Sequence, residues 1–463
     1  MTAFYARDRV WALGICVLLF SYTGIAQKKI ALGELVEAAR LHLPVLLQKQ
    51  ALVKSAQASE TDVKRSFLPQ VKFSEQLNLG SDNSLAGSFF TMGMTPSTSA
   101  GVRADNTLQA AAGNVAVLYG EYDLVNFGLN RSRVRYAESL TGLQVADQQR
   151  EAFLVAWQVA KLYFAILKQQ YRLDADRQNV RRYDSIFTVI RALAQSGLKA
   201  GADSSQAKAE LSKTRITYNQ TAAQVEQLKE QLHFYTGIPV TDLQADGFAK
   251  QFLVHTPLPV GMEDSVTANP LVDYYIKQRD LLSSREELIR KSYLPRILLA
   301  GSVWGRGSSI QYNDKFTALS NGLGFQRFNY SVGVAFTYNL FNGLYRRSKL
   351  AINRFDREAS DHALEQERAV LLSANRQTET LLQTLQANLS EYPVQLRSAL
   401  DTYHQKLAQY RAGLISLIDL TNASFVLYRS QTDYIEAISD WYLAQLNKAA
   451  LSGTLNQFIQ TLN

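Results

Sequence analysis

The most regular pattern of apolar and polar positions in the 463-residue chain lies between Phe328 and Phe341. Aromatic and β-branched residues alternate there with small or polar residues, which is the period of a β-strand. Strands of soluble proteins average about five or six residues, whereas about nine to eleven tilted residues cross a bilayer. We therefore predict a membrane strand, and a long strand of a soluble sandwich is the alternative. The predicted lipid-facing residues are Phe328, Tyr330, Val332, Val334, Phe336, Tyr338 and Leu340.

Three further strands are predicted, so that the chain has one strand pair within 71–127 and another within 297–341. The strand at 113–127 is the least regular of the four. Val115 and Val117 alternate in one register, and Tyr122 and Leu124 alternate in the other, so we expect a β-bulge near Gly120. The connecting stretches 81–112 and 305–327 are rich in Gly, Ser, Asn and Thr, which predicts exposed loops.

Helical segments surround each strand pair. We predict one helix at 32–65 and its counterpart at 271–291, each ending at a Leu-Pro step that disfavours helix. A very long helix then spans 129–194, which at about 1.5 Å per residue is roughly 100 Å long. Its counterpart at 344–411 contains Pro393, which should bend the helix or remove a hydrogen bond.

A helix returns after each long helix, at 204–235 and at 420–450. In the first of these, apolar positions recur at steps of four and then seven, which is typical of a coiled-coil seam. An ordinary amphipathic helix is the alternative. The positions of the predicted seam are Ala207, Leu211, Tyr218, Val225 and Leu232.

The same order of elements occurs twice. Phe67-Leu68-Pro69-Gln70 matches Tyr293-Leu294-Pro295-Arg296 at an offset of 226, and Tyr122–Asn126 matches Tyr338–Asn342 at an offset of 216. One insertion in the first half accounts for the two offsets. We therefore predict a first repeat at 27–240, a linker at 241–268 and a second repeat at 269–463.

The first 26 residues are predicted to be a secretory signal peptide. Arg7 and Arg9 precede the apolar run 11–20, and Gly24-Ile25-Ala26 supplies small residues at a cleavage site. An uncleaved anchor is the alternative. The chain's one cysteine, Cys16, lies in this segment, so the mature chain would have no thiol.

Charge and composition mainly exclude classes of function. The net charge is +8, but the basic residues are spread along the chain and form no stripe for nucleic acid. The five histidines are scattered, and the sequence contains no His-Glu-x-x-His, phosphate loop or nucleophile elbow. We therefore expect no enzyme, no metal and no cofactor. No apolar run of about 18 residues follows the signal, so a membrane-spanning chain would need a closed barrel.

Four strands cannot close a barrel, and an open edge is not tolerated in lipid, so the chain must assemble with copies of itself. In the offset repeat, the Leu-Pro steps, Tyr338–Gly343 and Asp419–Ala423, the sequence resembles the TolC-like outer-membrane efflux proteins. The resemblance implies an α+β homotrimer with a twelve-stranded outer-membrane β-barrel, continued by a long periplasmic α-helical coiled-coil barrel and built on a two-fold internal repeat. A periplasmic adaptor or coiled-coil scaffold without a pore is the alternative, and it would not need the strand at 328–340.

The resemblance also implies partners and a function. The family acts as the exit duct of a tripartite efflux pump or type I secretion system, and passes small molecules or proteins to the outside. It contacts outer-membrane lipid, a periplasmic adaptor protein and an inner-membrane pump of the RND or ABC type. The turns Gly197-Leu198 and Gly413-Leu414 match the tips at which the adaptor would bind.

The family narrows its pore at these helical tips. Asp419 matches the first aspartate of a constricting ring, and the position of the second holds Asn422. Tyr410 and Asp203 match a tyrosine and an aspartate of the tip lock, but the position of its arginine holds Ile415. Helix N-capping is the alternative role for both aspartates. We expect a narrow, cation-preferring pore whose constriction depends on Asp419.

Overall fold

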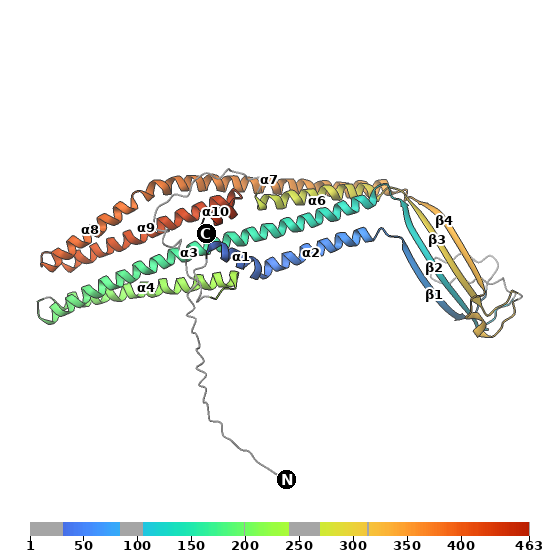
Figure 1. Ribbon diagram of the computed structural model, residues 1–463, viewed down its shortest axis with the longest axis horizontal. Coiled ribbons are helices and arrows are strands. Elements are labelled where there is room, and N and C mark those ends of the chain that lie inside the picture. Colours follow the sequence, from blue (N-terminus) through green and yellow to red (C-terminus); the bar gives the residue numbers. More distant parts are fainter. Residues whose placement is uncertain (1–30, 84–104, 199, 240–268, 313, 463) are drawn as a thin grey trace, which may run out of the picture.

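A computed structural model of the chain describes residues 31–83, 105–198, 200–239, 269–312 and 314–462. The expected signal peptide 1–26 and the linker 241–268 lie outside the described residues. Figure 1 shows an elongated molecule with a β-sheet at one end and two helical hairpin tips at the other. The helices between these ends run roughly along the long axis.

The sheet contains β1 (Gln70–Gly80), β2 (Ala111–Val125), β3 (Arg296–Ser308) and β4 (Arg327–Thr337). Neighbouring strands are antiparallel, in the order β1-β2-β3-β4. Within the described part of the chain, the outer edges of β1 and β4 pair with no other strand. Both edges therefore present backbone donors and acceptors that can pair with another chain.

Two details of the strands differ from the prediction. β4 ends at Thr337 rather than Phe341, because the Asn339 side chain accepts a hydrogen bond from the Phe341 amide at 2.9 Å and starts a turn. The bulge expected near Gly120 is absent, and the register shifts between Asp123 and Val125 instead.

The mixed pattern of β2 has a simple cause. The two registers seen in the sequence are the two faces of one strand, whose pairing is regular up to Asp123. Val117 is paired with Trp304 on the polar face, whereas Leu118 is paired with Val303 on the apolar face. The loop expected at 305–327 is also shorter than predicted, because β3 continues to Ser308 and a 3-10 turn, η3, forms at Leu319–Gly322.

The first helical segment is two helices, α1 (Leu32–His42) and α2 (Pro44–Arg65), not one. Pro44 disfavours the helical conformation in the residue before it, and Leu43 is extended with φ −70° and ψ 120°. The single helix predicted from the sequence is therefore wrong, because the Leu43-Pro44 step ends a helix just as the Leu-Pro step at the end of the segment does.

Most of the remaining helices form two long hairpins. α3 (Leu129–Gln195) and α4 (Gly201–Thr236) form the first. In the second, α7 (Asn342–Leu389) and α8 (Tyr392–Arg411) run to the tip and α9 (Leu417–Leu451) returns. α6 (Pro270–Ser292) precedes β3 and packs against α3 and α7, and α10 (Leu455–Thr461) follows α9. The break between α7 and α8 follows from Pro393, because its ring clashes with the carbonyl four residues earlier, at Leu389. No helix in the described part of the chain is both long and apolar enough to cross a membrane.

Buried positions follow coiled-coil spacing in both hairpins. Along α4 they are Ala207, Leu211, Thr214, Thr221, Val225, Leu232 and Thr236. Tyr218, which the sequence placed in this seam, is only half-buried, and Thr214 and Thr221 lie in the seam on either side of it. Threonine is tolerated there because Thr214 donates its hydroxyl hydrogen bond to the carbonyl of Leu211, at 2.8 Å.

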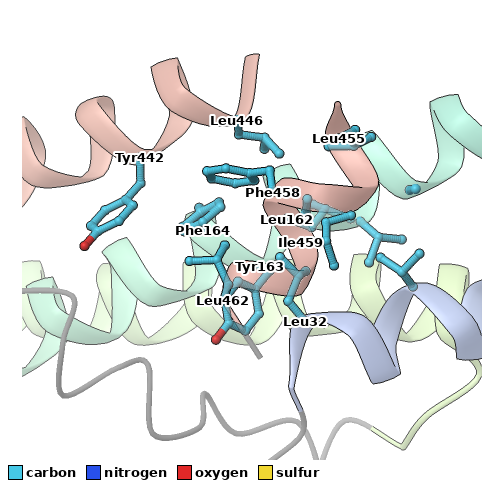
Figure 2. Close-up of a cluster of buried hydrophobic side chains, with 14 of the residues drawn as sticks. Leu32, Leu162, Tyr163, Phe164, Tyr442, Leu446, Leu455, Phe458, Ile459 and Leu462 are labelled. Carbon is cyan, nitrogen blue, oxygen red and sulfur yellow. The ribbon is translucent and has the colours of Figure 1, made fainter. Parts of the chain in front are cut away.

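The main core lies at mid-length, where α10 packs among helices of both repeats (Figure 2). Phe164 of α3 is fully buried, stacks on Tyr442 of α9 with ring centroids 5.6 Å apart, and also contacts Phe458 of α10. Asn269 caps α6 and donates to the carbonyls of Ala450 and Leu451, each at 3.0 Å. The Phe164 contacts therefore join the first repeat to the second, and the Asn269 hydrogen bonds join the start of the second repeat to its end.

Candidate functional site at the tips and the sheet

The two tips end in the same backbone motif. At the end of α3, the amides of Gly197 and Leu198 donate to the carbonyls of Ala194 and Leu193. At the end of α8, Gly413 and Leu414 donate to Tyr410 and Gln409 in the same way. This is the Schellman motif, which needs a left-handed residue, and the two glycines have φ 72° and 74°.

Each motif presents an exposed leucine at the end of the molecule. Leu198 is 71% exposed and Leu414 is 75% exposed. In a Schellman motif this residue usually packs back onto its own helix, so its exposure at both tips is unusual. The two leucines are equivalent positions of the repeat, and each gives its own tip an exposed apolar residue suited to contact with a partner protein.

Asp419 has a well-defined local role. It is the third residue of α9, and the amide and hydroxyl of Ser416 donate to its Oδ2 at 3.0 and 2.6 Å. The Asp419 amide donates back to the Ser416 hydroxyl, which completes a capping box. The hydrogen bonds from Ser416 lower the pKa of Asp419, so the exposed carboxylate stays charged. The capping role is present, and the geometry leaves the carboxylate at the solvent-facing end of α9.

Asp203 does not cap its helix. The N-cap of α4 is Ala200, and the structure records no side-chain cap there. Burial, followed by the negative charge of Asp203, raises the pKa of Tyr410, so these two residues of different hairpins are close enough to interact. Tyr410 is only 6% exposed and belongs to an apolar cluster against which Ile415 packs. Ile415, which stands where the resemblance to the family would place an arginine, therefore packs its aliphatic side chain against this cluster.

Asn422 lies one helical turn beyond Asp419 on α9 and is exposed. Residues three apart share a helix face, so the two side chains project from the same side. The four predicted tip residues therefore fall into two groups: Asp419 lies with Asn422 on one face of α9, and Tyr410 lies near Asp203 between the two hairpins.

A buried polar cluster between α3 and α9 was not found from the sequence. The Tyr428 hydroxyl donates to Asp176 Oδ1 at 2.6 Å, and Asp176 is only 2% exposed. Burial and this hydrogen bond raise the pKa of Tyr428 to about 12. Arg182, whose pKa burial lowers, donates to Asn179 at 3.1 Å and to Gln431 at 3.2 Å. The sequence does contain a feature that indicates this cluster, because Asp176 and Asn179 occupy seam positions, where a polar residue specifies register.

Among the described residues, none covers the apolar face of the sheet at β4. The predicted lipid-facing residues of β4 are 65–83% exposed, namely Phe328, Tyr330, Val332, Val334 and Phe336. The remaining two predicted positions, Tyr338 and Leu340, lie beyond the end of the strand. A contiguous apolar face of this kind marks contact with lipid or with another protein. Among the described residues, no group of His, Cys, Asp or Glu could hold a metal ion.

The sequence profile of the outer membrane efflux protein family matches residues 35–238 and 276–454. The chain therefore belongs to this family of outer-membrane channels. The two matched segments correspond to the two halves of the internal repeat, and the chain is placed in the outer membrane with a large periplasmic helical portion. None of the curated proteins compared with the sequence is similar to it.

Solved structures share the fold over nearly the whole chain. CusC has a TM-score of 0.74 at 16% identity, with 92% of each chain covered. VceC of Vibrio cholerae has a TM-score of 0.72 at 16% identity, covering 91% of this chain and 96% of its own. The MtrE channel of Neisseria gonorrhoeae has a TM-score of 0.70 at 18% identity, covering 92% and 89%. The fold is thus that of the TolC-like channels, with a four-stranded sheet and long helical hairpins.

Proposed function

We propose that the chain is the outer-membrane exit duct of a tripartite efflux pump or type I secretion system, and that it works as a homotrimer. One observation carries the proposal. A sheet with two open edges and an exposed apolar face continues directly into helical hairpins about 100 Å long. Three copies joined edge to edge, β4 to β1, would satisfy every edge and form one barrel above one helical tube.

Pore control is proposed at the tips. In a trimer, three Asp419 carboxylates would face the same axis, and each is held ionised by Ser416. Carboxylate rings favour cations and narrow a pore. Tyr410 and Asp203, which lie close enough for the charge of Asp203 to raise the pKa of Tyr410, would hold the two hairpins together on the closed side.

Partners are proposed for the same end of the molecule. The exposed Leu198 and Leu414 give each protomer two equivalent apolar contacts for a periplasmic adaptor protein. The adaptor would in turn connect the duct to an inner-membrane transporter. Small molecules or proteins would then leave the cell through the tube.

The test is electron microscopy of the mature chain purified in detergent, followed by conductance in planar bilayers. A three-fold cylinder that conducts ions is the expected result. A compact monomer or a two-fold rod would overturn the channel and favour an adaptor or scaffold.

For the tips, a Leu198→Ser/Leu414→Ser variant should still form conducting trimers but lose binding to the adaptor protein of the same pump. Retained binding would remove the leucines from that role.

A further inference from the structure

Two arginines face each other near the loop end of the sheet, the end away from the helices. Arg306 of β3 and Arg327 of β4 are direct cross-strand partners, and both are exposed. Directly opposed side chains have Cβ atoms about 5 Å apart, and like charges at such positions destabilise the pair. A pair of opposed arginines is therefore a costly arrangement for the sheet alone.

The register assigns this pair to the polar face. The next pair inward on the same face is Trp304 with Asn329, followed by Ser302 with Ser331. The apolar residues Phe328 and Tyr330 alternate with these positions and belong to the other face. In the proposed barrel, both guanidinium groups therefore point into the lumen.

No acidic residue compensates the pair on its own face. The row that runs across the sheet at this level is Gln76, Val115, Arg306 and Arg327. Within the part of the chain that the structure describes, no carboxylate forms an ion pair with either arginine. The nearest acid in the sequence of β1, Glu75, belongs to the opposite face, where it accepts a hydrogen bond from Asn114 at 3.1 Å. The connections at this end of the sheet contain Asp82, Asp105 and Asp314, and no described ion pair joins any of them to Arg306 or Arg327.

We propose that Arg306 and Arg327 form a binding site, at the outer mouth of the lumen, for small anions that carry two or more phosphate or carboxylate groups. The inference rests on the proposed trimeric channel. A guanidinium binds phosphate and carboxylate oxygens in a bidentate fork, and two adjacent forks suit a multivalent anion. Two arginines from each protomer would form a ring whose field is concentrated within a narrow pore.

The site gives the duct opposite charges at its two ends. The proposed Asp419 ring attracts cations at the periplasmic tip, and the arginine ring attracts anions at the outer mouth. A multivalent anion applied from outside would bind the arginine ring and reduce the current. The same anion applied from the tip side would first meet the carboxylates and block less.

The test is single-channel conductance of the purified full-length trimer in planar bilayers, with inorganic pyrophosphate added to either side. Outside addition should block the wild-type channel at a lower concentration than tip-side addition. The double variant Arg306→Gln/Arg327→Gln should raise the half-blocking concentration from outside at least about tenfold. Arg296→Gln is the matched control for the single variants Arg306→Gln and Arg327→Gln, because each of the three removes one charge per protomer from the polar face, and Arg296 lies at the helix end of β3.

The outcomes separate the two proposals. If the wild-type chain forms no channels, the proposed function fails and the anion site fails with it. If channels form and pyrophosphate blocks the double variant as well as the wild type, the channel stands and the anion site is overturned. Equal loss of block in Arg296→Gln would also overturn it, because the effect would then come from total charge in the lumen rather than from this pair.

Discussion

At the residue scale, Asp419 combines a structural and a proposed electrostatic role in one carboxylate. Replacing it with alanine removes both, so Asp419→Ala should raise conductance and weaken block by Mg²⁺ from the tip side at least about tenfold. Ser416→Ala separates the roles, because it removes the cap, at a cost of about 1 kcal/mol, and keeps the charge. Bilayer recordings of the two variants check this, and unchanged block in Asp419→Ala would remove the residue from the gate.

The pH dependence of that block gives a second test of the same carboxylate. Hydrogen bonds from Ser416 depress the pKa of Asp419, so the charged form persists to a lower pH than it would without them. Cation block in the wild type should therefore persist as pH falls. In Ser416→Ala the main cause of the shift is gone, and block should disappear at a higher pH than in the wild type. Equal midpoints in the two proteins would contradict the link.

The buried pair Tyr428–Asp176 makes a prediction about stability. Tyr428→Phe leaves a buried carboxylate without its donor, which should cost about 1–3 kcal/mol and lower the melting temperature followed by circular dichroism. The folded-state pKa of Tyr428 is raised from 10.0 to about 12. Its contribution should thus be complete below pH 10 and be lost as pH rises toward 12. The control is Tyr345→Phe at an exposed site. A wild-type melting temperature in Tyr428→Phe would show that the pair is not stabilising.

Individual residues were predictable where they sit in a local motif. The position of Asp419 at the start of a helix follows from the repeat, and its capping partner Ser416 lies three residues away in sequence. The Asp176 cluster could not be found in this way, because its partners come from helices some 250 residues apart. A pattern of apolar seam positions does not mark a polar residue such as Asp176 at a heptad site.

At the element scale, the tip turns depend on glycine. Gly413 has φ 74° with open space around it, so an alanine there is strained by its backbone and not by contacts. Gly413→Ala should cost about 1–2 kcal/mol. Gly142, inside α3 with nothing near its Cβ position, is the matched control, because alanine there should stabilise the helix by about 0.5–1 kcal/mol. Thermal melts should therefore shift in opposite directions, and a shift in the same direction would contradict the left-handed turn.

Most helices and strands could be predicted from the period of their apolar positions, and the errors have physical causes. Pro44 breaks a helix at Leu43 because a proline restricts the residue before it. Val115 and Val117 suggested a bulge because apolar residues occupy the polar face of β2, opposite Arg306 and Trp304. Pattern alone cannot tell a lumen-facing valine from a lipid-facing one, since that distinction depends on the neighbouring strand.

At the scale of the whole molecule, the apolar face of β4 should determine insertion into the membrane. Val332 lies near the middle of the strand and is 74% exposed. Val332→Arg places a charge toward lipid and should cost about 2–4 kcal/mol per protomer, which should abolish insertion into liposomes. Ser331→Arg is the control, because Ser331 belongs to the polar face. Equal insertion of the two variants would show that this face does not meet lipid.

The open edges of β1 and β4 have a consequence for genetics. Because no protomer can satisfy its own edges, the proposed trimeric duct needs three competent copies, and one defective copy should inactivate the whole assembly. An allele that folds normally but cannot complete the edge pairing at β4 should therefore be dominant over the wild type. At equal expression and random mixing, only about one eighth of the trimers would contain three wild-type chains. A strain that carries both alleles should accordingly resemble a null strain in export activity far more than its gene dosage suggests.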